Sequence, residues 1–282
     1  MPRLMLTFLL AGIFIHSTPS LIDAESNTAN RWLSLETGLD IGTFKSPQKS
    51  IVGDSTIHIL RINPRNFKFN LLTARSSKKG KRLSAKKWAK TNNMIATINA
   101  SMYQADKMTS VSYMRTKGHV NNTWVSEDKT LLAFDSTTPS VPSIQIIDRD
   151  CQDFKKMRKL YETLIQSIRM VSCRGENVWQ QQSKKWSTAA IGTDNQGRVL
   201  FIHARSPYTT HDLISILLNL PIELKQAMYV EGGPDAQLYI NTGKKEFEFL
   251  GSYSSESFEH DENNVAWPLP NVLGIQRTTR ED

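Results

Sequence analysis

The chain has 282 residues, 39% of them hydrophobic, which is enough to bury the core of one large domain. Its formal net charge is +8, from 35 Lys and Arg against 27 Asp and Glu. The sequence contains no internal repeat, no low-complexity linker and, after its N-terminus, no apolar segment long enough to cross a bilayer. These features exclude a repeat architecture and a multispan membrane protein.

Residues 1–24 predict an export signal. Arg3 supplies a positive charge, residues 4–15 form a short apolar run, and small and polar residues follow up to Ala24. Cleavage fits after Ser20 or after Ala24, and we favour Ala24; an uncleaved membrane anchor is the alternative. No cysteine follows the signal, so a lipid anchor is not indicated. We therefore expect a cleaved signal peptide and a periplasmic or secreted mature protein without a transmembrane segment.

The positive charge belongs to the mature domain, because the predicted signal contains one base and one acid. Much of it gathers in one stretch, at Lys78, Lys79, Lys81, Arg82, Lys86, Lys87 and Lys90. The polyanions that an exported protein meets are phosphorylated glycans, lipid headgroups and envelope polymers, so nucleic acid is not an expected partner. We interpret the stretch itself as the solvated face of a helix and its preceding loop.

The pattern of short apolar and alternating runs predicts many strands after a lead-in at residues 25–50. The strands span residues 57–62, 67–73, 94–98, 111–116, 120–124, 130–134, 144–147, 189–192, 199–203, 227–230, 236–240 and 271–275. Turn residues at 63–66, 117–118 and 194–197 predict hairpins between the strands that flank them. Residues 252–264 are acidic and predict a surface loop.

Three segments predict helices. Residues 84–92 form the first, with Ser84 as its cap, residues 153–168 the second, and residues 211–220 the third, which stops at Pro221. Many short strands with few helices indicate an α+β fold, built as a single domain on a mixed or antiparallel sheet with a few packed helices.

The chain has two cysteines, Cys151 and Cys173, on either side of the second predicted helix. In an oxidising compartment, two cysteines and no others predict one disulfide that closes this excursion. Because no group of residues has the spacing of a metal site, we expect neither a metal nor another cofactor, and the same reasoning disfavours a catalytic thiol.

A polar turn follows the apolar run at residues 227–230. It contains Glu231, then Gly232 and Gly233, which permit close approach to the backbone. If this turn is a site, Glu231 is its acid, base or nucleophile, and the glycine amides line an anion pocket. The alternative is an ordinary hairpin turn with a surface glutamate.

Four blocks resemble the signature of the phosphodiester glycosidase family, which includes the lysosomal uncovering enzyme and many bacterial secreted proteins. In chain order they are Asn99-Ala100-Ser101-Met102-Tyr103, Thr188-Ala189-Ala190-Ile191-Gly192 with the turn Asp194 to Gly197, His203-Ala204-Arg205-Ser206, and Val230-Glu231-Gly232-Gly233-Pro234-Asp235. The chain departs from the family pattern at Glu231, Ala204, His203 and Ser187-Thr188. The resemblance therefore implies a divergent, exported bacterial member, with a phosphodiester glycosidase-like domain at residues 51–282.

The resemblance implies hydrolysis between the anomeric carbon of a sugar and a phosphate diester. Phosphate is a weakly basic leaving group, so one carboxylate and a phosphate clamp can suffice. Glu231 is the expected nucleophile or general base, and Arg205 is the expected bidentate clamp unless it forms a structural salt bridge. Asn99 completes the expected catalytic set. The expected substrate-binding residues are Tyr103, Thr188, His203, Gly232, Gly233 and Asp235.

Each of these residues also has a structural interpretation. Asn99 is alternatively the cap of a turn, and Tyr103 an amphipathic residue that only fills space. Thr188 is alternatively an ordinary strand residue, and His203 a buried core residue. Asp235 is near Glu231 in sequence, and two neighbouring carboxylates can divide into an acid and a base. The function hypotheses are thus an exported hydrolase of glycosyl phosphodiesters or, alternatively, a non-catalytic envelope module that binds phosphorylated or acidic glycans. The sequence gives no oligomeric state.

Overall fold

The computed structural model describes residues 30–78 and 80–278. The predicted signal peptide and the first residues of the predicted lead-in lie outside this part of the chain. None of the helices within it has the length and apolarity that a membrane span requires.

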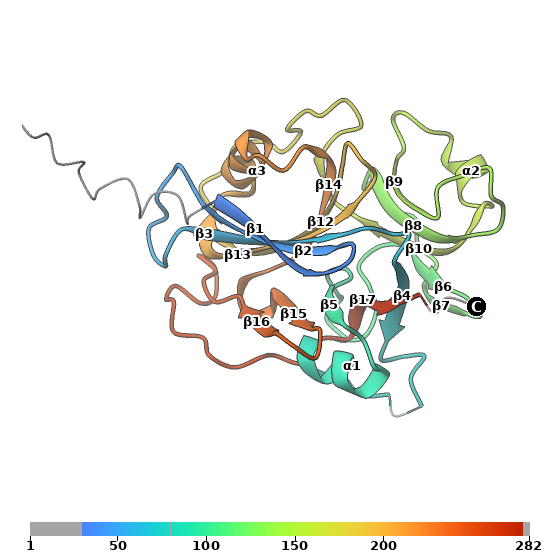
Figure 1. Ribbon diagram of the computed structural model, residues 1–282, viewed down its shortest axis with the longest axis horizontal. Coiled ribbons are helices and arrows are strands. Elements are labelled where there is room, and N and C mark those ends of the chain that lie inside the picture. The colour runs from blue at the N-terminus through green and yellow to red at the C-terminus, as the bar shows by residue number, and fades with distance from the viewer. Residues whose placement is uncertain (1–29, 79, 279–282) are drawn as a thin grey trace, which may run out of the picture.

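Three antiparallel sheets make up most of the fold (Figure 1). The first contains, in spatial order, β1 (Asn30–Glu36), β2 (Leu39–Lys45), β3 (Thr56–Ile62), β13 (Val199–Tyr208), β12 (Trp186–Asp194), β14 (Leu224–Gly232) and β11 (Arg169–Val171). The second contains β16 (Glu246–Leu250), β15 (Gln237–Asn241), β5 (Ala96–Asn99), β17 (Asn271–Arg277) and β4 (Phe67–Thr73). The third contains β7 (His119–Asn122), β6 (Met114–Thr116), β10 (Tyr161–Ser167), β8 (Thr130–Ser136) and β9 (Ile144–Asp148).

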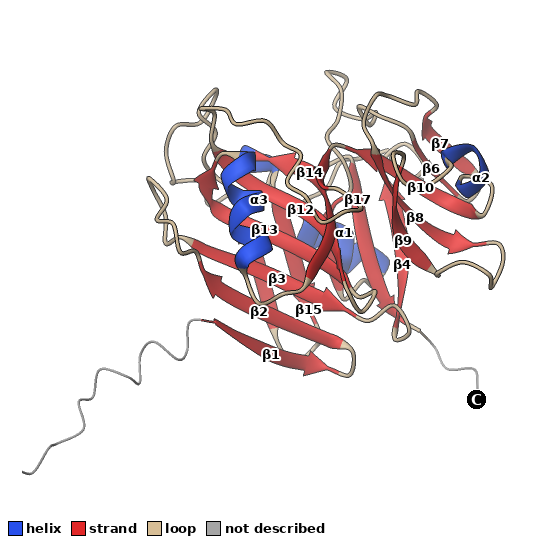
Figure 2. Cartoon of the chain, turned by 90° about the horizontal axis from the view of Figure 1, so that it is seen from above, coloured by secondary structure: helices blue, strands red, loops and turns tan. Residues whose placement is uncertain are grey.

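The elements stack in layers. Helix α3 (Thr210–Asn219) covers one face of the first sheet, the second sheet packs on the other face, and α1 (Ala85–Asn92) covers the far side of the second sheet (Figure 1). The third sheet lies beside these layers with the short helix α2 (Phe154–Met157), as Figure 2 shows. Since all three sheets contribute to one core, the chain forms a single α+β domain, as predicted.

The main core lies where the three sheets meet. In β4 the inward residues Phe67, Phe69 and Leu71 are buried at every second position, as the period of a strand requires. The ring of Phe69 lies 6.3 Å from that of Phe134 in the third sheet and 6.4 Å from that of Phe201 in the first. One aromatic side chain therefore joins all three sheets.

The predicted cap of the first helix is confirmed, and the third helix has a cap that was not predicted. Ser84 accepts a hydrogen bond from the backbone N–H of Lys87 and so caps α1, which ends at Asn93 in a left-handed conformation. Thr209 caps α3 in the same way through the N–H of Asp212. Trp88 and Ala89 of α1 and Leu213 and Leu217 of α3 are buried against their sheets.

The hairpin predicted around residues 63–66 is wrong, although both of its strands exist. β3 pairs with β2 and β13 in the first sheet, whereas β4 pairs with β17 in the second. Leu60 and Ile62 of β3 share one core with Phe67 and Phe69 of β4, so the two strands pack face to face across the core. β14 and β15 likewise lie in different sheets and share the same core, so the turn between them is not a hairpin turn. The hairpins predicted at residues 117–118 and 194–197 are confirmed.

The helix predicted over residues 153–168 is largely wrong, because only Phe154–Met157 is helical. Most of the rest of this segment, Tyr161–Ser167, is β10, a central strand paired with both β6 and β8. Tyr161, Thr163 and Ile165 favour a strand, and all three are buried there. Pairing on both sides decided the conformation of this ambiguous apolar run.

Besides β10, four strands of the described residues lack a counterpart among the predicted strands. Two of them, β1 and β2, form a hairpin from residue 30 to residue 45 that joins the first sheet through β3. The sheet therefore begins within the stretch interpreted as a lead-in. The other two, β11 and β16, are edge strands, whose weak pattern reflects pairing on one side only.

The predicted disulfide joins Cys151 to Cys173 and encloses α2, β10 and β11. Replacing both cysteines by serine is expected to lower the free energy of unfolding by about 3 kcal/mol, because the bond restricts the unfolded chain. Urea unfolding of the parent and the double variant measures this loss. Reduction of the parent by dithiothreitol should reproduce it, and an unchanged urea midpoint in both comparisons would contradict the prediction.

Candidate functional site

The candidate site forms where the chain leaves the first sheet and enters the second. Strand β14 ends at Gly232, a 3-10 turn covers Gly233–Asp235, and β15 begins at Gln237. Gly233 has a left-handed φ of 62°. A Cβ on Gly232 would overlap the hydroxyl of Tyr229, so a side chain does not fit there. The glycine pair thus fixes how Glu231 and Asp235 are presented on either side of the turn.

Glu231 and Asp235 form a pair of coupled carboxyl groups. Burial raises the pKa of Glu231 well above its ordinary value, and the neighbouring charge of Asp235 raises it further. A hydrogen bond from the Gly232 N–H lowers this pKa but does not cancel the increase. Burial also raises the pKa of Asp235. Two carboxyl groups that share a poorly solvated site do not ionise together easily. Such groups are typical of acid–base chemistry.

Tyr103 reaches the pair from the loop that follows β5. Its hydroxyl donates to Asp235 Oδ1 over 2.9 Å. This bond lowers the pKa of the Asp235 carboxyl and so opposes the increase in pKa that burial causes. Burial and the charge of Asp235 raise the pKa of Tyr103 in turn, so the phenol keeps its proton and remains a donor. The structure therefore brings Tyr103, which the sequence selected from a different block, to the pair Glu231 and Asp235.

Asn99 holds the turn from behind. Its Nδ2 donates to the backbone carbonyl of Asp235 over 2.9 Å, and its Oδ1 accepts from the backbone N–H of Gln237 over 2.7 Å. Asn99 is 2% exposed, so these bonds are shielded from water. In this structure Asn99 touches the backbone on both sides of Ala236 and positions the Asp235 carboxylate.

Replacing Asn99 by Ala is expected to cost about 2 kcal/mol of stability, because the backbone groups of Asp235 and Gln237 lose buried partners. Thermal unfolding measures this cost. Asn195→Ala is the matched control, since it removes an exposed side-chain amide in the turn at residues 194–197. A smaller loss in the control is expected, whereas equal stability of the parent and Asn99→Ala would contradict the assignment.

Two basic residues that the sequence interpretation did not select as site residues lie near the acid pair. The positive charges of Arg82 and Lys107 both lower the pKa of Asp235. Arg82 belongs to the basic stretch interpreted as a solvated face, and Lys107 lies in the loop after Tyr103. The sequence carries no local signal for either role, because the loops that contain them meet Asp235 only in the folded chain.

An aromatic cluster flanks the same turn. The ring of Tyr229 lies 5.7 Å from that of Trp179 and 6.4 Å from that of Trp186. Trp186 Cδ1 lies 3.0 Å from the position that a Cβ on Gly232 would take. The buried indole Nε1 of Trp186 has no hydrogen-bond partner among the described residues. Sequence reasoning missed Tyr229 and Trp186, which look like ordinary strand residues.

Thr188 lies in β12 directly opposite both Gly232 and Ala204. Its side chain is fully buried, and its hydroxyl donates to the carbonyl of Trp186 over 3.5 Å. Thr188 therefore adjoins the acid turn through the strand backbone.

Arg205 does not join the contacts of the acid pair. Its Nη1 donates to the carbonyl of Leu250, its Nη2 donates to the carbonyls of Asp261 and Asn263, and its Nε lies 2.7 Å from Asp261 Oδ1. Three of the five guanidinium N–H groups thus donate to backbone carbonyls at residues 250–263, and the Asp261 carboxylate pairs with the guanidinium charge. This geometry matches the structural salt bridge that was the alternative for Arg205.

His203 lies beside Arg205, on the other side of the turn from Tyr103. It is fully buried, and its Nε2 lies 3.3 Å from the carbonyl of Ala236. The loop at residues 252–264 is irregular, as predicted, but it is anchored by the buried side chains of Ser252 and Asn263 as well as by Arg205. Asn99 and Tyr103 thus contact Asp235, whereas His203 contacts Ala236 and Arg205 contacts the loop at residues 250–263.

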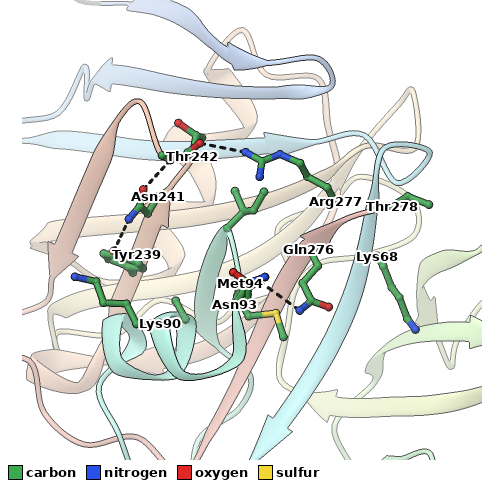
Figure 3. Close-up of a pocket in the computed structure, with 13 residues that line it drawn as sticks. Lys68, Lys90, Asn93, Met94, Tyr239, Asn241, Thr242, Gln276, Arg277 and Thr278 are labelled. Carbon is green, nitrogen blue, oxygen red and sulfur yellow. Dashed lines mark hydrogen bonds between the residues drawn. The ribbon is translucent and has the colours of Figure 1, made fainter. Parts of the chain in front are cut away.

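A cavity of about 830 Å³ lies at the opposite end of β15, β5 and β17 (Figure 3). Two of its polar side chains donate to nearby backbone, Gln276 to the carbonyl of Asn93 and Arg277 to that of Thr242. None of the predicted site residues lines this cavity.

One group of potential metal ligands occurs in the described part of the chain, namely Asp148 with Cys151 and Cys173. The two sulfur atoms form the disulfide, and Asp148 accepts hydrogen bonds from Arg169 and from the N–H of Cys173. These atoms are already engaged in structural bonds.

Comparisons with known proteins agree with this architecture. The catalytic domain of zebrafish N-acetylglucosamine-1-phosphodiester alpha-N-acetylglucosaminidase, autoinhibited by its propeptide, has a TM-score of 0.62 and 15% identity, over 89% of this chain and 87% of that one. A hypothetical protein from Synechocystis has a TM-score of 0.53 and 12% identity, over 87% and 63%. At these identities the likeness shows the fold. No curated protein matches the sequence significantly.

A family model described as phosphodiester glycosidase matches residues 92–276, which is well over half of the chain. The matched region contains Asn99, Tyr103, Glu231 and Asp235. This chain belongs to the phosphodiester glycosidase family.

Proposed function

We propose that this protein hydrolyses glycosyl phosphodiesters and cleaves the bond to the anomeric carbon of the sugar. The observation that carries the proposal is the coupled pair of Glu231 and Asp235, with Tyr103 bonded to it and the charges of Arg82 and Lys107 acting on it. A binding module has no need for two poorly solvated carboxyl groups, whereas an acid–base catalyst does.

The two carboxyl groups divide into an acid and a base. Burial and the charge of Asp235 raise the pKa of Glu231 well above normal, which favours the protonated form. Asp235 is the ionised member, because the Tyr103 hydroxyl and two nearby cations stabilise its charge. This division reverses the expectation that Glu231 would be the nucleophile or general base.

In the proposed reaction, Asp235 takes a proton from a water molecule as the water oxygen bonds to the anomeric carbon. The bond from that carbon to the phosphate oxygen breaks, and Glu231 gives its proton to the departing phosphate. The products are a free sugar and a phosphate monoester. Since phosphate is a weak base, the proton from Glu231 assists departure without having to drive it.

Arg82 and Lys107 are the proposed phosphate-binding residues, in place of Arg205. Their charges already act on Asp235, so a phosphate bound beside the acid pair would meet both. Arg205 is less suited, because the carbonyls of Leu250, Asp261 and Asn263 and the carboxylate of Asp261 occupy its N–H groups.

The proposal is tested by measuring sugar release from a panel of synthetic glycosyl phosphodiesters with the purified protein and with Arg82→Gln. The variant is expected to raise KM about tenfold, since removing one charge–phosphate contact costs about 1.4 kcal/mol. Lys87→Gln is the matched control, because Lys87 is an exposed cation of the same basic stretch. Equal KM values for both variants, or no release from any diester, would contradict the assignment.

We also propose that the protein works in the periplasm or outside the cell. The predicted signal and the Cys151–Cys173 disulfide support an oxidising compartment. Cell fractionation, with N-terminal sequencing of the recovered protein, tests this location and the expected cleavage after Ala24. Recovery of the uncleaved chain in the cytoplasm would contradict it.

A further inference from the structure

Large apolar side chains are exposed in the irregular segment between β16 and β17. Val265 is 60% exposed and Trp267 is 37% exposed. The ring of Phe258, which is only partly buried, lies 6.3 Å from that of Trp267 in an edge-on arrangement. We call these three residues the apolar patch. Apolar side chains that gather in water beside polar groups are typical of a binding surface.

Two contacts place the apolar patch beside the acid turn. The carbonyl of Phe258 accepts from the N–H of Ser254, and the side chain of Ser254 lies 3.2 Å from the position that a Cβ on Gly233 would take. The carbonyl of Trp267 accepts from Nε2 of Gln237, at the start of β15, over 2.7 Å. The apolar patch therefore adjoins the turn that carries the two carboxyl groups.

Arg82 connects the apolar patch to the proposed phosphate site. Its Nη1 donates to the carbonyl of Pro268, next to Trp267 in sequence, over 3.3 Å. Its charge lowers the pKa of Asp235 and opposes the increase in the pKa of Tyr103. A diester bound by Arg82 with its sugar at the acid pair therefore has the apolar patch within reach of its other ester group.

Apolar side chains also accompany the two proposed phosphate-binding residues. Leu83 follows Arg82 in sequence and Met108 follows Lys107, and both pack with Leu269 in one cluster. Leu83 and Met108 are only partly buried, so each leaves part of its apolar surface in water. The two cations are thus set beside apolar atoms that continue toward the patch.

Two observations favour an uncharged, apolar occupant. The two backbone carbonyls at residues 267 and 268 already accept from Gln237 and Arg82, so this segment offers few free acceptors to the hydroxyl groups of a sugar. The exposed charges next to it have both signs, with Glu259 beside Phe258 and Lys81 beside Arg82 in sequence. A polyanion or an anionic bilayer therefore meets no field of a single sign here.

We propose that the apolar patch binds an apolar chain on the far side of the phosphate, so that the substrate is a glycosyl phosphodiester of a lipid alcohol, either an isoprenoid or an alkyl chain. The inference rests on the proposed function, because it takes the phosphate to lie at Arg82 and Lys107. Burial of the chain against the rings of Phe258 and Trp267 supplies affinity. The chain selects the substrate and takes no part in bond breaking.

Binding of phosphate monoesters tests the inference without any turnover. Geranyl phosphate and octyl phosphate, below the concentrations at which they form micelles, are titrated into the purified protein by calorimetry, beside methyl phosphate and a hexose 6-phosphate. At least one apolar ester is expected to bind about tenfold more tightly than either polar ester, which corresponds to the burial of about two methylene groups. The tighter of the two identifies the kind of chain. Equal affinities, tighter binding of the hexose 6-phosphate, or no binding at all would overturn the inference.

Variants at Trp267 locate the chain. Trp267→Ala should weaken binding of the apolar ester about tenfold and leave methyl phosphate unchanged, whereas Trp267→Phe keeps an aromatic ring and should retain most of the preference. Leu33→Ala is the matched control, because Leu33 is 43% exposed in β1, the strand of the first sheet farthest from β14. Far-ultraviolet circular dichroism checks folding. An unchanged preference in a folded Trp267→Ala variant would exclude the apolar patch as the site.

Sugar release separates this inference from the proposed function. Two diesters that share one sugar and differ only in a methyl or a geranyl group should differ in KM by about tenfold, and Trp267→Ala should remove the difference. Binding of geranyl phosphate that depends on Trp267, with no release from any diester, would uphold the apolar patch as a binding site while the proposed function fails. Release with the same KM from both diesters would support the proposed function and overturn this inference.

Discussion

Replacing Glu231 by Gln should strongly slow sugar release while the protein stays folded. The amide keeps the shape of the side chain but has no proton to donate to the departing phosphate. General acid catalysis typically contributes about 10²–10⁴-fold, so kcat/KM is expected to fall by about that factor. The measurement is release from the best diester of the panel, beside far-ultraviolet circular dichroism of both proteins.

Glu176→Gln is a matched control, since it makes the same change in the irregular segment after β11 and outside the contacts of the site. It should leave kcat/KM unchanged. Full activity of a folded Glu231→Gln variant would exclude Glu231 as the acid. A parent protein that binds phosphorylated glycans without cleaving them, and loses affinity with added salt, would instead favour the non-catalytic module.

The same substitution should raise stability at neutral pH. Burial raises the pKa of Glu231 in the folded chain above its unfolded value of about 4.3. As pH rises above the unfolded value, the unfolded chain releases a proton that the folded chain retains, so the parent loses stability until pH passes the folded pKa. Glutamine does not titrate. The gain in Tm of Glu231→Gln over the parent should therefore grow from about pH 4 upward, and a constant difference would contradict the assigned pKa.

Replacing Asp235 by Asn should have the second large effect, a loss of about 10²-fold in kcat with an altered pH profile. In the parent, activity falls on the alkaline side as Glu231 loses its proton. The charge of Asp235 raises the pKa of Glu231, so removing that charge lowers this pKa and moves the alkaline limb to lower pH. The acid limb, which reports protonation of Asp235, should disappear. The pH dependence of the residual kcat/KM measures both changes.

Tyr103→Phe provides the control for this profile. It removes only the hydrogen bond to Asp235 Oδ1, which lowers the pKa of Asp235 in the parent. The acid limb should then move to higher pH, because the carboxylate has lost a donor. An alkaline limb that stays in place in Asp235→Asn would show that Glu231 and Asp235 titrate independently, against the proposed coupling.

Local rules predicted much of the secondary structure. Alternating apolar residues identified β4, a continuous apolar run identified β8, and Ser84 marked the start of α1. Two cysteines in a chain with an export signal predicted the Cys151–Cys173 bond. The order and spacing of four short blocks predicted the family. Each of these conclusions depends on residues close together in sequence or on a count, and both are properties of the chain before it folds.

The errors share one cause, which is that pairing partners are distant in sequence. The strands on either side of residues 63–66 look like a hairpin, but β3 and β4 lie in different sheets. The apolar run at Tyr161–Ser167 became a strand because β6 and β8 flank it on both sides. An apolar strand can bury its side chains either by pairing edge to edge or by packing face to face. The sequence of the strand alone therefore does not predict which arrangement forms.

The sequence by itself determined the α+β class, the family, the disulfide and the carboxylates of the acid turn. The tertiary structure decided what surrounds those carboxylates. It directed Arg205 to the loop carbonyls, used Asn99 to hold the turn, and brought Arg82 and Lys107 close enough for their charges to act on Asp235. The reason is physical, because burial and charge act through space on Glu231 and Asp235, and the distances that set both exist only after β5, β14 and β15 have packed together.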